Sequence, residues 1–362
     1  MTASHLPIAH RRVRVLIIDD SALMRKVLTD VLGADPDIEV VGTASDPLVA
    51  REKIKQLNPD VITLDIEMPN LDGLTFLERL MRLRPMPVVM VSALIPKDTE
   101  ATLQALEMGA VDFIPKPVFD IAQGFHEMRE IAAAKIKAAA GAVIHARDAA
   151  QSRPPRVSGT FKGSNRIVAI GASTGGVAAL SEILAALPAD GPPIVIAQHM
   201  PPGFTRQFAK RLDGFCAMSV GEAVHDARII PGHAYIAPGD RHLSVRRSGG
   251  FYYCQLTEGP MVNGHMPSVD VLFRSVAESA TSAGIGLLLT GMGQDGAVGL
   301  KRMRIAGAVT ACQDEATSLI YGMPKAAMSI GAAQREIALD QMARFIVDQT
   351  RESAPQTDVQ AR

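Results

Sequence analysis

A serine, a histidine and an aspartate, each placed after an apolar run, are the residues of this chain best suited to chemistry. Ser173 lies in the glycine-flanked segment Gly171–Gly176, between an apolar run and a helix-like one. His199 ends a second apolar run, and Asp295 lies in a glycine-rich turn after a third. A serine nucleophile, a histidine base and an aspartate that orients the histidine are the groups that acyl transfer requires.

Each of these three signals has a simpler interpretation when it is taken alone. Gly171–Gly176 fits the strand-to-helix turn that presents a serine nucleophile, but also a degraded phosphate- or dinucleotide-binding loop, or a plain tight turn. His199 alone is typical of a structural histidine, and Asp295 alone of a helix N-cap. Because the carboxyl ends of parallel strands meet at one edge of a sheet, the three together predict a shared site. Their chain order, Ser–His–Asp, differs from the Ser–acid–His order of α/β-hydrolases.

Composition limits the classes of protein that need to be considered. The chain has 362 residues, enough for two domains, with 47% hydrophobic and 21% charged residues. A net charge of −1 gives no general attraction to nucleic acid or to an anionic membrane surface. No apolar run reaches the roughly 18 residues of a membrane span, and the start lacks the apolar segment of a signal peptide. Three widely spaced cysteines indicate buried free thiols, so we expect a cytoplasmic location.

The first third of the chain alternates strand and helix patterns. Ser21 is expected to cap the first helix and Gly33 to end it. This alternation predicts a doubly wound, flavodoxin-like domain with a five-stranded parallel sheet. The strands are expected at 13–18, 38–43, 61–65, 88–92 and 111–114.

Polar residues gather at the ends of these expected strands. They are Asp19 and Asp20 after the first strand, Asp65 after the third, Ser92 after the fourth and Lys116 after the fifth. Three carboxylates at the switch point of this topology are suited to Mg²⁺, and a lysine there can neutralise a phosphoryl group.

These letters resemble a response-regulator receiver domain over about residues 13–118. The matching motifs are Asp19-Asp20, Asp65-x-x-Met68-Pro69-x-x-Asp72-Gly73, Ser92-Ala93 and Lys116-Pro117. The resemblance implies that Asp65 is the phosphoacceptor and that Mg²⁺ is held by Asp19, Asp20, Asp65 and the Glu67 carbonyl. It implies phospho-switch roles for Ser92, Phe113 and Lys116, and makes the Lys116–Pro117 bond a candidate cis peptide.

The composition changes after residue 118, where we expect the receiver domain, 1–118, to end. Residues 119–163 are expected to be a linker, with an Ala/Lys-rich helical stretch at 131–142 followed by a Ser, Pro, Gly and Arg-rich stretch. A second domain is expected over 164–350, and the polar tail 351–362 is expected to be disordered.

The second domain contains several short runs with a specific order of residues. Besides Gly171–Gly176, they are Gln198–Thr205, Pro238–His242, Pro267–Phe273, Thr290–Gly296 and Tyr321–Ala327. In these runs the domain resembles the catalytic domain of the chemotaxis protein-glutamate methylesterases, which are also glutamine deamidases. One departure is Met266, where a basic residue is expected before Pro267-Ser268.

This resemblance implies a doubly wound, mostly parallel α/β fold and a catalytic triad of Ser173, His199 and Asp295. It implies that the oxyanion is stabilised at Thr174 and Met292, and that hydrolysis needs no metal. The implied enzyme is a phosphorylation-activated methylesterase and glutaminase that serves chemotactic adaptation. Its implied partners are methyl-accepting chemotaxis receptors as substrates and a chemotaxis histidine kinase as phosphodonor; a monomer that binds no nucleic acid and does not insert into the membrane is expected. The other histidines, among them His242 and His265, are expected to have loop or structural roles.

Two other classes of protein compete with this interpretation. A receiver joined to a nucleotide- or phosphate-binding module would use Gly171–Gly176 as a cradle, but it leaves His199 and Asp295 unexplained. A receiver-controlled transcription factor would need a helix-turn-helix or a basic face after residue 118, and neither signal is present.

Overall fold

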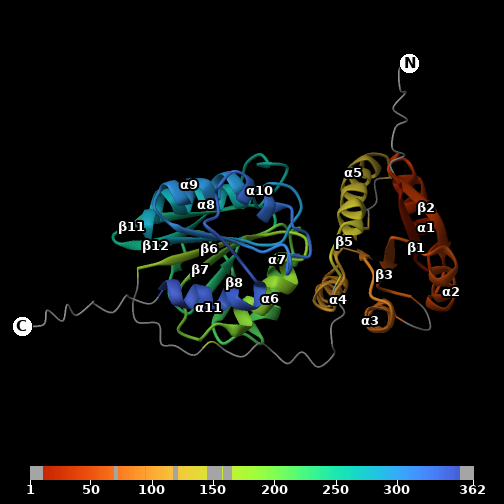
Figure 1. The fold of residues 1–362 in the computed structure, drawn as a ribbon, viewed down its shortest axis with the longest axis horizontal. Helices are drawn as coiled ribbons and strands as arrows, with labels where there is room; N and C mark the ends of the chain where they lie inside the picture. Colours follow the sequence, from red (N-terminus) through yellow and green to blue (C-terminus); the bar gives the residue numbers. More distant parts are fainter. Residues whose placement is uncertain are drawn as a thin grey trace, which may run out of the picture. The chain divides into compact units, whose positions relative to one another are not determined.

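The computed structural model consists of two compact units, Met1–Ala149 and Ala150–Arg362, which are described separately here (Figure 1). The described residues are 11–68, 72–93, 95–116, 121–144, 157 and 165–350. Pro117, most of the Ser, Pro, Gly and Arg-rich part of the expected linker, and the tail 351–362 lie outside the described residues, as do the expectations that fall on them.

The first unit is the predicted flavodoxin-like fold. Its strands are all parallel in the order β2-β1-β3-β4-β5, which is the doubly wound order expected of this class. The strands are β1 (Val13–Ile18), β2 (Ile38–Ala44), β3 (Val61–Asp65), β4 (Val88–Ser92) and β5 (Asp112–Pro115), and the helices are α1 (Ala22–Gly33), α2 (Pro47–Leu57), α3 (Gly73–Leu83), α4 (Pro96–Glu107) and α5 (Ile121–Ala140).

Short side chains with oxygen acceptors cap the first three helices of this unit. Ser21 caps α1 by accepting a hydrogen bond from the backbone N–H of Met24, as predicted, and Asp46 and Asp72 cap α2 and α3 in the same way. Gly33 is the last residue of α1, as expected. It is not a left-handed cap, and Ala34 follows it in right-handed geometry.

Helix α5 extends the receiver unit past the boundary that we expected at residue 118. Its alanines Ala132 and Ala139 and its Ile136 are buried, and the helix lies against α1 and β5. Lys135 also forms an ion pair with Asp112 of β5, at 2.6 Å. The Ala/Lys-rich stretch therefore belongs to the packed fold, because its alanines let the helix approach the sheet closely.

The second unit is a seven-stranded parallel sheet in the order β15-β14-β13-β6-β7-β10-β8, with a separate antiparallel sheet in the order β11-β12-β9. This agrees with the predicted mostly parallel α/β fold, to which the antiparallel sheet is an addition. The strands are β6 (Ile167–Ala172), β7 (Ile194–Gln198), β8 (Ser219–Glu222), β9 (Arg228–Ile229), β10 (His233–Ile236), β11 (His242–Ser248), β12 (Phe251–Thr257), β13 (Gly284–Leu288), β14 (Val309–Gln313) and β15 (Arg335–Ile337). The helices are α6 (Gly176–Ala186), α7 (Phe204–Asp213), α8 (Val269–Ala280), α9 (Ala297–Ile305), α10 (Met323–Ser329) and α11 (Leu339–Thr350), with the 3₁₀ turn η1 (Thr281–Ala283).

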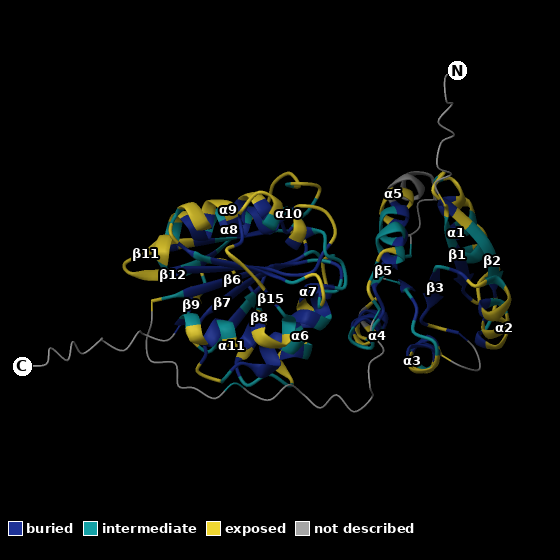
Figure 2. Cartoon of the chain, viewed as in Figure 1, coloured by how far each residue is buried: buried dark blue, intermediate teal, exposed yellow. Residues whose placement is uncertain are grey.

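Helices cover both faces of this sheet, with α8, α9 and α10 on one side and α6 and α11 on the other (Figure 1). The central strands β6, β7 and β13 are buried along their whole length, and Figure 2 shows β6 and β7 in dark blue. Such a strand reads as a continuous apolar run, which is why the sequence predicts these strands well.

The cysteines fit the expectation of free thiols, with one difference. Cys254 and Cys312 are buried, and burial raises the pKa of both thiols to about 12, so they are inert at neutral pH. Cys216 is only partly buried, contrary to the expectation.

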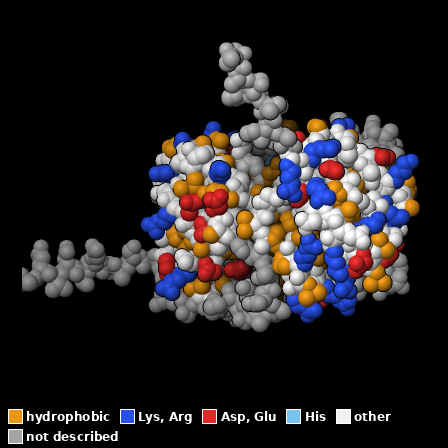
Figure 3. All heavy atoms as spheres, turned by 45° about the vertical axis from the view of Figure 1, so that its right-hand side comes forward, with side chains coloured by type: hydrophobic (Ala, Val, Ile, Leu, Met, Phe, Trp, Pro, Cys, Tyr) orange, Lys and Arg blue, Asp and Glu red, His pale blue; other side chains and the backbone are white. Residues whose placement is uncertain are grey.

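The face drawn in Figure 3 carries charged side chains of both signs. Basic and acidic side chains both occur on the face drawn in Figure 3, together with hydrophobic ones, in keeping with the net charge of −1. Among the described residues, no helix combines the length and the apolar character that crossing a membrane requires.

Candidate active site

Three adjacent strands bring the candidate triad to one edge of the large sheet. Strands β13, β6 and β7 are neighbours, and all run parallel. Ser173 follows β6, His199 follows β7, and Asp295 lies in the turn between β13 and α9. All three residues lie at the carboxyl edge of the sheet, where ligands bind to parallel sheets.

The turn that holds Ser173 depends on its glycines. Gly175 has φ +82°, a left-handed conformation that glycine adopts without strain. A Cβ at Gly176 would collide with Oε1 of Gln198, so the first turn of α6 approaches β7 closely. The backbone N–H of Ser173 donates to the Thr290 carbonyl at 3.0 Å, which fixes the serine relative to the end of β13.

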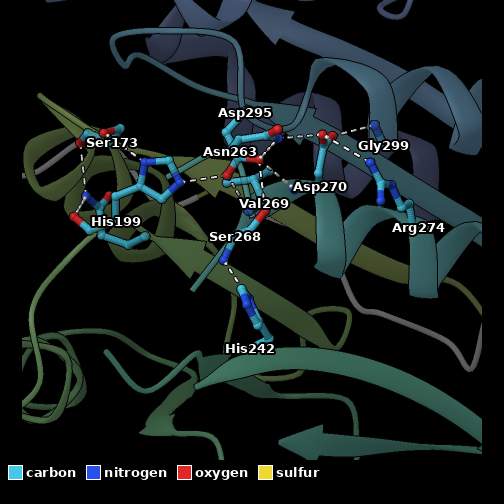
Figure 4. A network of polar contacts seen from close by, with 11 residues as sticks. Ser173, His199, His242, Asn263, Ser268, Val269, Asp270, Arg274, Asp295 and Gly299 are labelled. Carbon is cyan, nitrogen blue, oxygen red and sulfur yellow. Dashed lines mark hydrogen bonds and ion pairs between the residues drawn. The ribbon is translucent and has the colours of Figure 1, made fainter. Parts of the chain in front are cut away.

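His199 connects Ser173 to Asp295 by two hydrogen bonds (Figure 4). Its Nδ1 lies 3.1 Å from Ser173 Oγ, and its Nε2 lies 2.8 Å from Asp295 Oδ2. An ionised Asp295 only accepts hydrogen bonds, so Nε2 carries the proton and Nδ1 accepts the hydroxyl proton of Ser173. The two ring nitrogens exchange the places that they hold in the chymotrypsin template, and the same chemistry is available.

Asp295 is buried, and donors surround its carboxylate. Besides His199, it accepts hydrogen bonds from Asn263 Nδ2, Ser268 Oγ and the backbone N–H groups of Val269 and Asp270. Burial alone would raise the pKa of Asp295, but the contact with His199 and the bonds from Asn263 and Val269 outweigh it and hold the pKa below its usual value. Asp295 is therefore ionised wherever the protein is folded and near neutral pH.

The helix that Asp295 caps is α8, which precedes it in the chain. The two backbone N–H groups that it accepts belong to the first turn of α8. The helix that follows Asp295, α9, instead has Gly296 at its N-cap position and no side-chain cap. The positive end of the α8 dipole thus adds to the stabilisation of this carboxylate.

Several residues around Asp295 escaped the sequence reasoning. Asn263 also donates to Asp270, a second buried carboxylate, which accepts from the Gly299 N–H at 2.6 Å and lies 3.6 Å from the Arg274 guanidinium (Figure 4). His242 accepts a hydrogen bond from the Ser268 N–H and contacts the Pro260 carbonyl, a structural role as expected. The run Pro267–Phe273 contains Ser268 and Asp270, so the resemblance indicated this segment, but it implied no role for either residue.

The two residues expected near the oxyanion lie beside Ser173. Thr174 follows it directly and is buried, with 9% exposure. A Cβ built at Gly291 would lie 2.7 Å from Ser173 Cβ, which places the next residue, Met292, beside the serine. Among the described residues, no acceptor contacts the Met292 N–H, so it is available to a ligand.

The receiver unit has its own polar cluster at the carboxyl edge of its sheet. One ligand atom each of Asp19, Asp20 and Asp65 lies within 4.8 Å of the others, the spacing of a cation site. Lys116 Nζ lies 2.8 Å from Asp65 Oδ1 and 3.9 Å from Asp19 Oδ2. Asp19 Oδ2 is buried without a hydrogen-bond partner, and burial together with Asp65 raises the pKa of Asp19 to about 6. A divalent cation would bind the Asp19 oxygen that lacks a hydrogen-bond donor and would offset the repulsion between Asp19 and Asp65. These residues therefore fit Mg²⁺.

The other residues with expected roles in the receiver lie in β4, in β5 and after β3. Ser92 is buried, its hydroxyl donates to the Ala93 carbonyl, and it accepts a hydrogen bond from Thr102 Oγ1 at 2.7 Å. Phe113 is buried, with the Lys135 ammonium 4.7 Å from its ring centroid. The Glu67 carboxylate turns to Lys97, at 2.7 Å, so any contribution of this residue to a metal falls to its carbonyl.

Comparison with known proteins gives the same division of the chain. Residues 168–346 match the family of CheB methylesterases, and residues 15–127 match the response regulator receiver domains. The protein-glutamate methylesterase/protein-glutamine glutaminase of Paraburkholderia xenovorans is 51% identical over 348 residues, which cover 93% of this chain and 96% of that protein. A relative of the same name from Geobacter metallireducens is 52% identical over 342 residues, which cover 92% and 94%.

A solved structure supports the fold of the second unit. The catalytic domain of Thermotoga maritima CheB methylesterase has 36% sequence identity to this chain and a TM-score of 0.51, and covers 52% of this chain and 100% of its own. The chain is therefore a member of the protein-glutamate methylesterase/protein-glutamine glutaminase family, a chemotaxis response regulator whose receiver domain precedes its hydrolase domain.

Proposed function

We propose that this enzyme hydrolyses methylated glutamate side chains, and deamidates glutamines, on chemoreceptors through Ser173, His199 and Asp295. The observation that carries the proposal is the continuous hydrogen-bond chain from the Ser173 hydroxyl through His199 to the buried, ionised Asp295. It supports a nucleophile over a phosphate cradle, because a cradle would not need the histidine or the aspartate.

The proton positions define the first half of the reaction. Ser173 Oγ attacks the ester carbonyl carbon while its proton passes to His199 Nδ1, and Asp295 stabilises the imidazolium through Nε2–H. The carbon–oxygen bond to the methoxy group then breaks, and Nδ1–H protonates the departing oxygen, so that methanol leaves and an ester to Ser173 remains.

Water completes the cycle by the same route. His199 takes a proton from the water, which attacks the acyl-enzyme, and returns it to Ser173 Oγ, so that the free glutamate carboxylate is released. A glutamine side chain follows the same steps, with ammonia as the leaving group. The backbone N–H groups of Thr174 and Met292 are the proposed oxyanion donors, and one such donor is typically worth about 3 kcal/mol in the transition state.

The receiver unit is proposed to control this reaction. Asp65 accepts the phosphoryl group from a chemotaxis histidine kinase, Lys116 contacts the added group, and Ser92 and Phe113 respond to it. Mg²⁺, held by Asp19, Asp20, Asp65 and the Glu67 carbonyl, would neutralise charge at this site when bound. The unphosphorylated receiver restrains the hydrolase, and phosphorylation shifts the population toward the active state.

Methanol release from methylated receptor fragments tests the triad. Ser173→Ala should remain folded and lose several orders of magnitude in kcat, since triad residues act as a unit. His199→Ala should cost about as much, and the double variant little more. Substantial methanol release by a folded Ser173→Ala protein would show that Ser173 is not the nucleophile.

A further inference from the structure

The short turn Val262–His265 faces the His199–Asp295 pair. The backbones of Val262 and His265 exchange two hydrogen bonds, N–H to carbonyl in both directions, each at 3.0 Å. Between them, Asn263 has φ +56° and Gly264 has φ +78°. Asn-Gly is the dipeptide that such a two-residue turn prefers, because both positions need a left-handed backbone. The backbone therefore sets the directions of both side chains that flank Gly264.

The side chain of Asn263 is directed at the carboxylate of the pair. Its Nδ2 donates to Asp295 Oδ1 at 2.8 Å and to Asp270 Oδ2 at 2.8 Å. Both carboxylates are buried, with exposures of 2% and 1%. The amide group of one residue thus bridges two buried carboxyl groups, and Asp295 keeps the orientation that His199 Nε2 requires (Figure 4).

The side chain of His265 is directed at the other member of the pair. Its ring stacks on the His199 ring, with centroids 3.7 Å apart and planes inclined by 12°. Rotation of His199 about its Cβ–Cγ bond would drive its ring into the His265 ring.

We propose that the turn Val262–His265 is a positioning element that aligns the His199–Asp295 pair for Ser173, with Asn263 acting through Asp295 and His265 acting through His199. The inference rests on the proposed triad and extends it. Neither Asn263 nor His265 exchanges a proton with the substrate in this scheme. They act on the alignment of the base in the chemical step, so their loss lowers kcat and leaves KM nearly unchanged.

Replacement of Asn263 by glycine isolates the side-chain contribution. Glycine keeps the left-handed backbone of the turn and removes only the amide. In the full-length protein, Asn263→Gly should lower kcat for methanol release about 10- to 100-fold, the size expected of a hydrogen bond to a charged group. The matched control is Asn58→Gly, which removes another asparagine with positive φ, in the receiver unit.

A double-mutant cycle distinguishes positioning from a general structural effect. If Asn263 acts through the Asp295 carboxylate, Asn263→Gly should change kcat by less than about threefold in an Asp295→Asn background, because the interaction is already lost. Equal fold losses in both backgrounds would overturn the assignment of Asn263. Denaturation midpoints of all four proteins show whether each variant is folded.

The stacking role of His265 is tested by its replacement with alanine, which removes the ring, and with phenylalanine, which keeps an aromatic ring. His265→Ala should lower kcat about three- to tenfold, the value of a close aromatic pair, and His265→Phe should restore most of it. The control is His233→Ala, since His233 also lies beside an aromatic ring, Tyr235, but begins β10 at the opposite edge of the sheet. A His265→Phe variant as impaired as His265→Ala would overturn the stacking role.

The two proposals fail in different ways. If Ser173→Ala is inactive while Asn263→Gly and His265→Ala both match the wild type, the triad stands and the positioning role of the turn is wrong. If folded Ser173→Ala keeps its activity, the triad itself is wrong, whatever the turn variants show.

Discussion

Two buried aspartates have pKa shifts of opposite sign, and the donors around each explain the difference. Asp295 accepts hydrogen bonds from His199, Asn263, Ser268 and the first turn of α8, so its charged form is stabilised although it is buried. Asp19 has a buried oxygen without a hydrogen-bond partner and lies beside Asp65, so its charged form is disfavoured. The first carboxylate is prepared to orient a histidine, and the second is prepared to receive a cation.

The raised pKa of Asp19 predicts how the stability of the receiver unit depends on pH. The pKa is about 6 in the folded protein, whereas an unfolded aspartate has a pKa of about 3.9. The folded state therefore holds this proton more tightly, and the free energy of unfolding without Mg²⁺ should fall as pH rises from about 4 through about 6. Asp19→Asn should remove this part of the slope.

Amide exchange of β1 and β3 measures that stability in the intact chain. The free energy of unfolding of Asp19→Asn should exceed that of the wild type by more at about pH 7 than at about pH 5, where the wild-type carboxyl is mostly protonated. Mg²⁺ should stabilise the wild type more than the variant, because an anionic ligand is lost. A difference between the two proteins that does not change with pH would contradict the prediction.

At the scale of elements, the loop after β13 packs closely against the loop after β6. A Cβ at Gly291 would lie 2.7 Å from Ser173 Cβ and would collide with Met323 Sδ. Gly291→Ala should therefore displace Met292 from Ser173 and lower kcat at least tenfold, as the loss of an oxyanion donor does. The control is Gly221→Ala in β8, where nothing lies within 4 Å of the added carbon. Equal kcat values for the two variants would argue against an oxyanion role for the Met292 N–H.

Elements with a strong local signal could be predicted from the sequence, and elements that tertiary contacts define could not. The buried strands β6, β7 and β13 are apolar runs bounded by polar or glycine-rich turns, so the strand ends that precede Ser173, His199 and Asp295 could be located. Helix α5 was assigned to the linker, because its pattern of small alanines does not show that a sheet lies beneath it. The donors to Asp295 come from a non-repetitive turn and a helix terminus, where no periodicity marks them.

For the molecule as a whole, two units in one chain predict separable activities. The hydrolase unit contains its own sheet, core and triad, and a solved relative consisting of the catalytic domain alone is similar to it. A fragment of residues 164–350 should therefore fold. If the unphosphorylated receiver restrains the hydrolase, this fragment should release methanol faster than the unphosphorylated full-length chain.

Phosphorylation of the full-length chain should have the same direction of effect as removal of the receiver. A small phosphodonor with Mg²⁺ should raise kcat of the wild type, while Asp65→Asn should take up no phosphoryl group and keep only the basal rate. The fragment should not respond to the phosphodonor, because it lacks the Asp19–Asp20–Asp65 cluster. Radiolabel incorporation and methanol release, measured on the same three proteins, test phosphorylation and activation separately.

A different result would separate restraint by the receiver from activation by its phosphorylation. If the fragment is no faster than the unphosphorylated parent but the phosphodonor still activates the parent, the receiver does not restrain the hydrolase. The phosphorylated receiver would then activate the hydrolase directly, because phosphorylation can raise the rate only by favouring the active state over the inactive one.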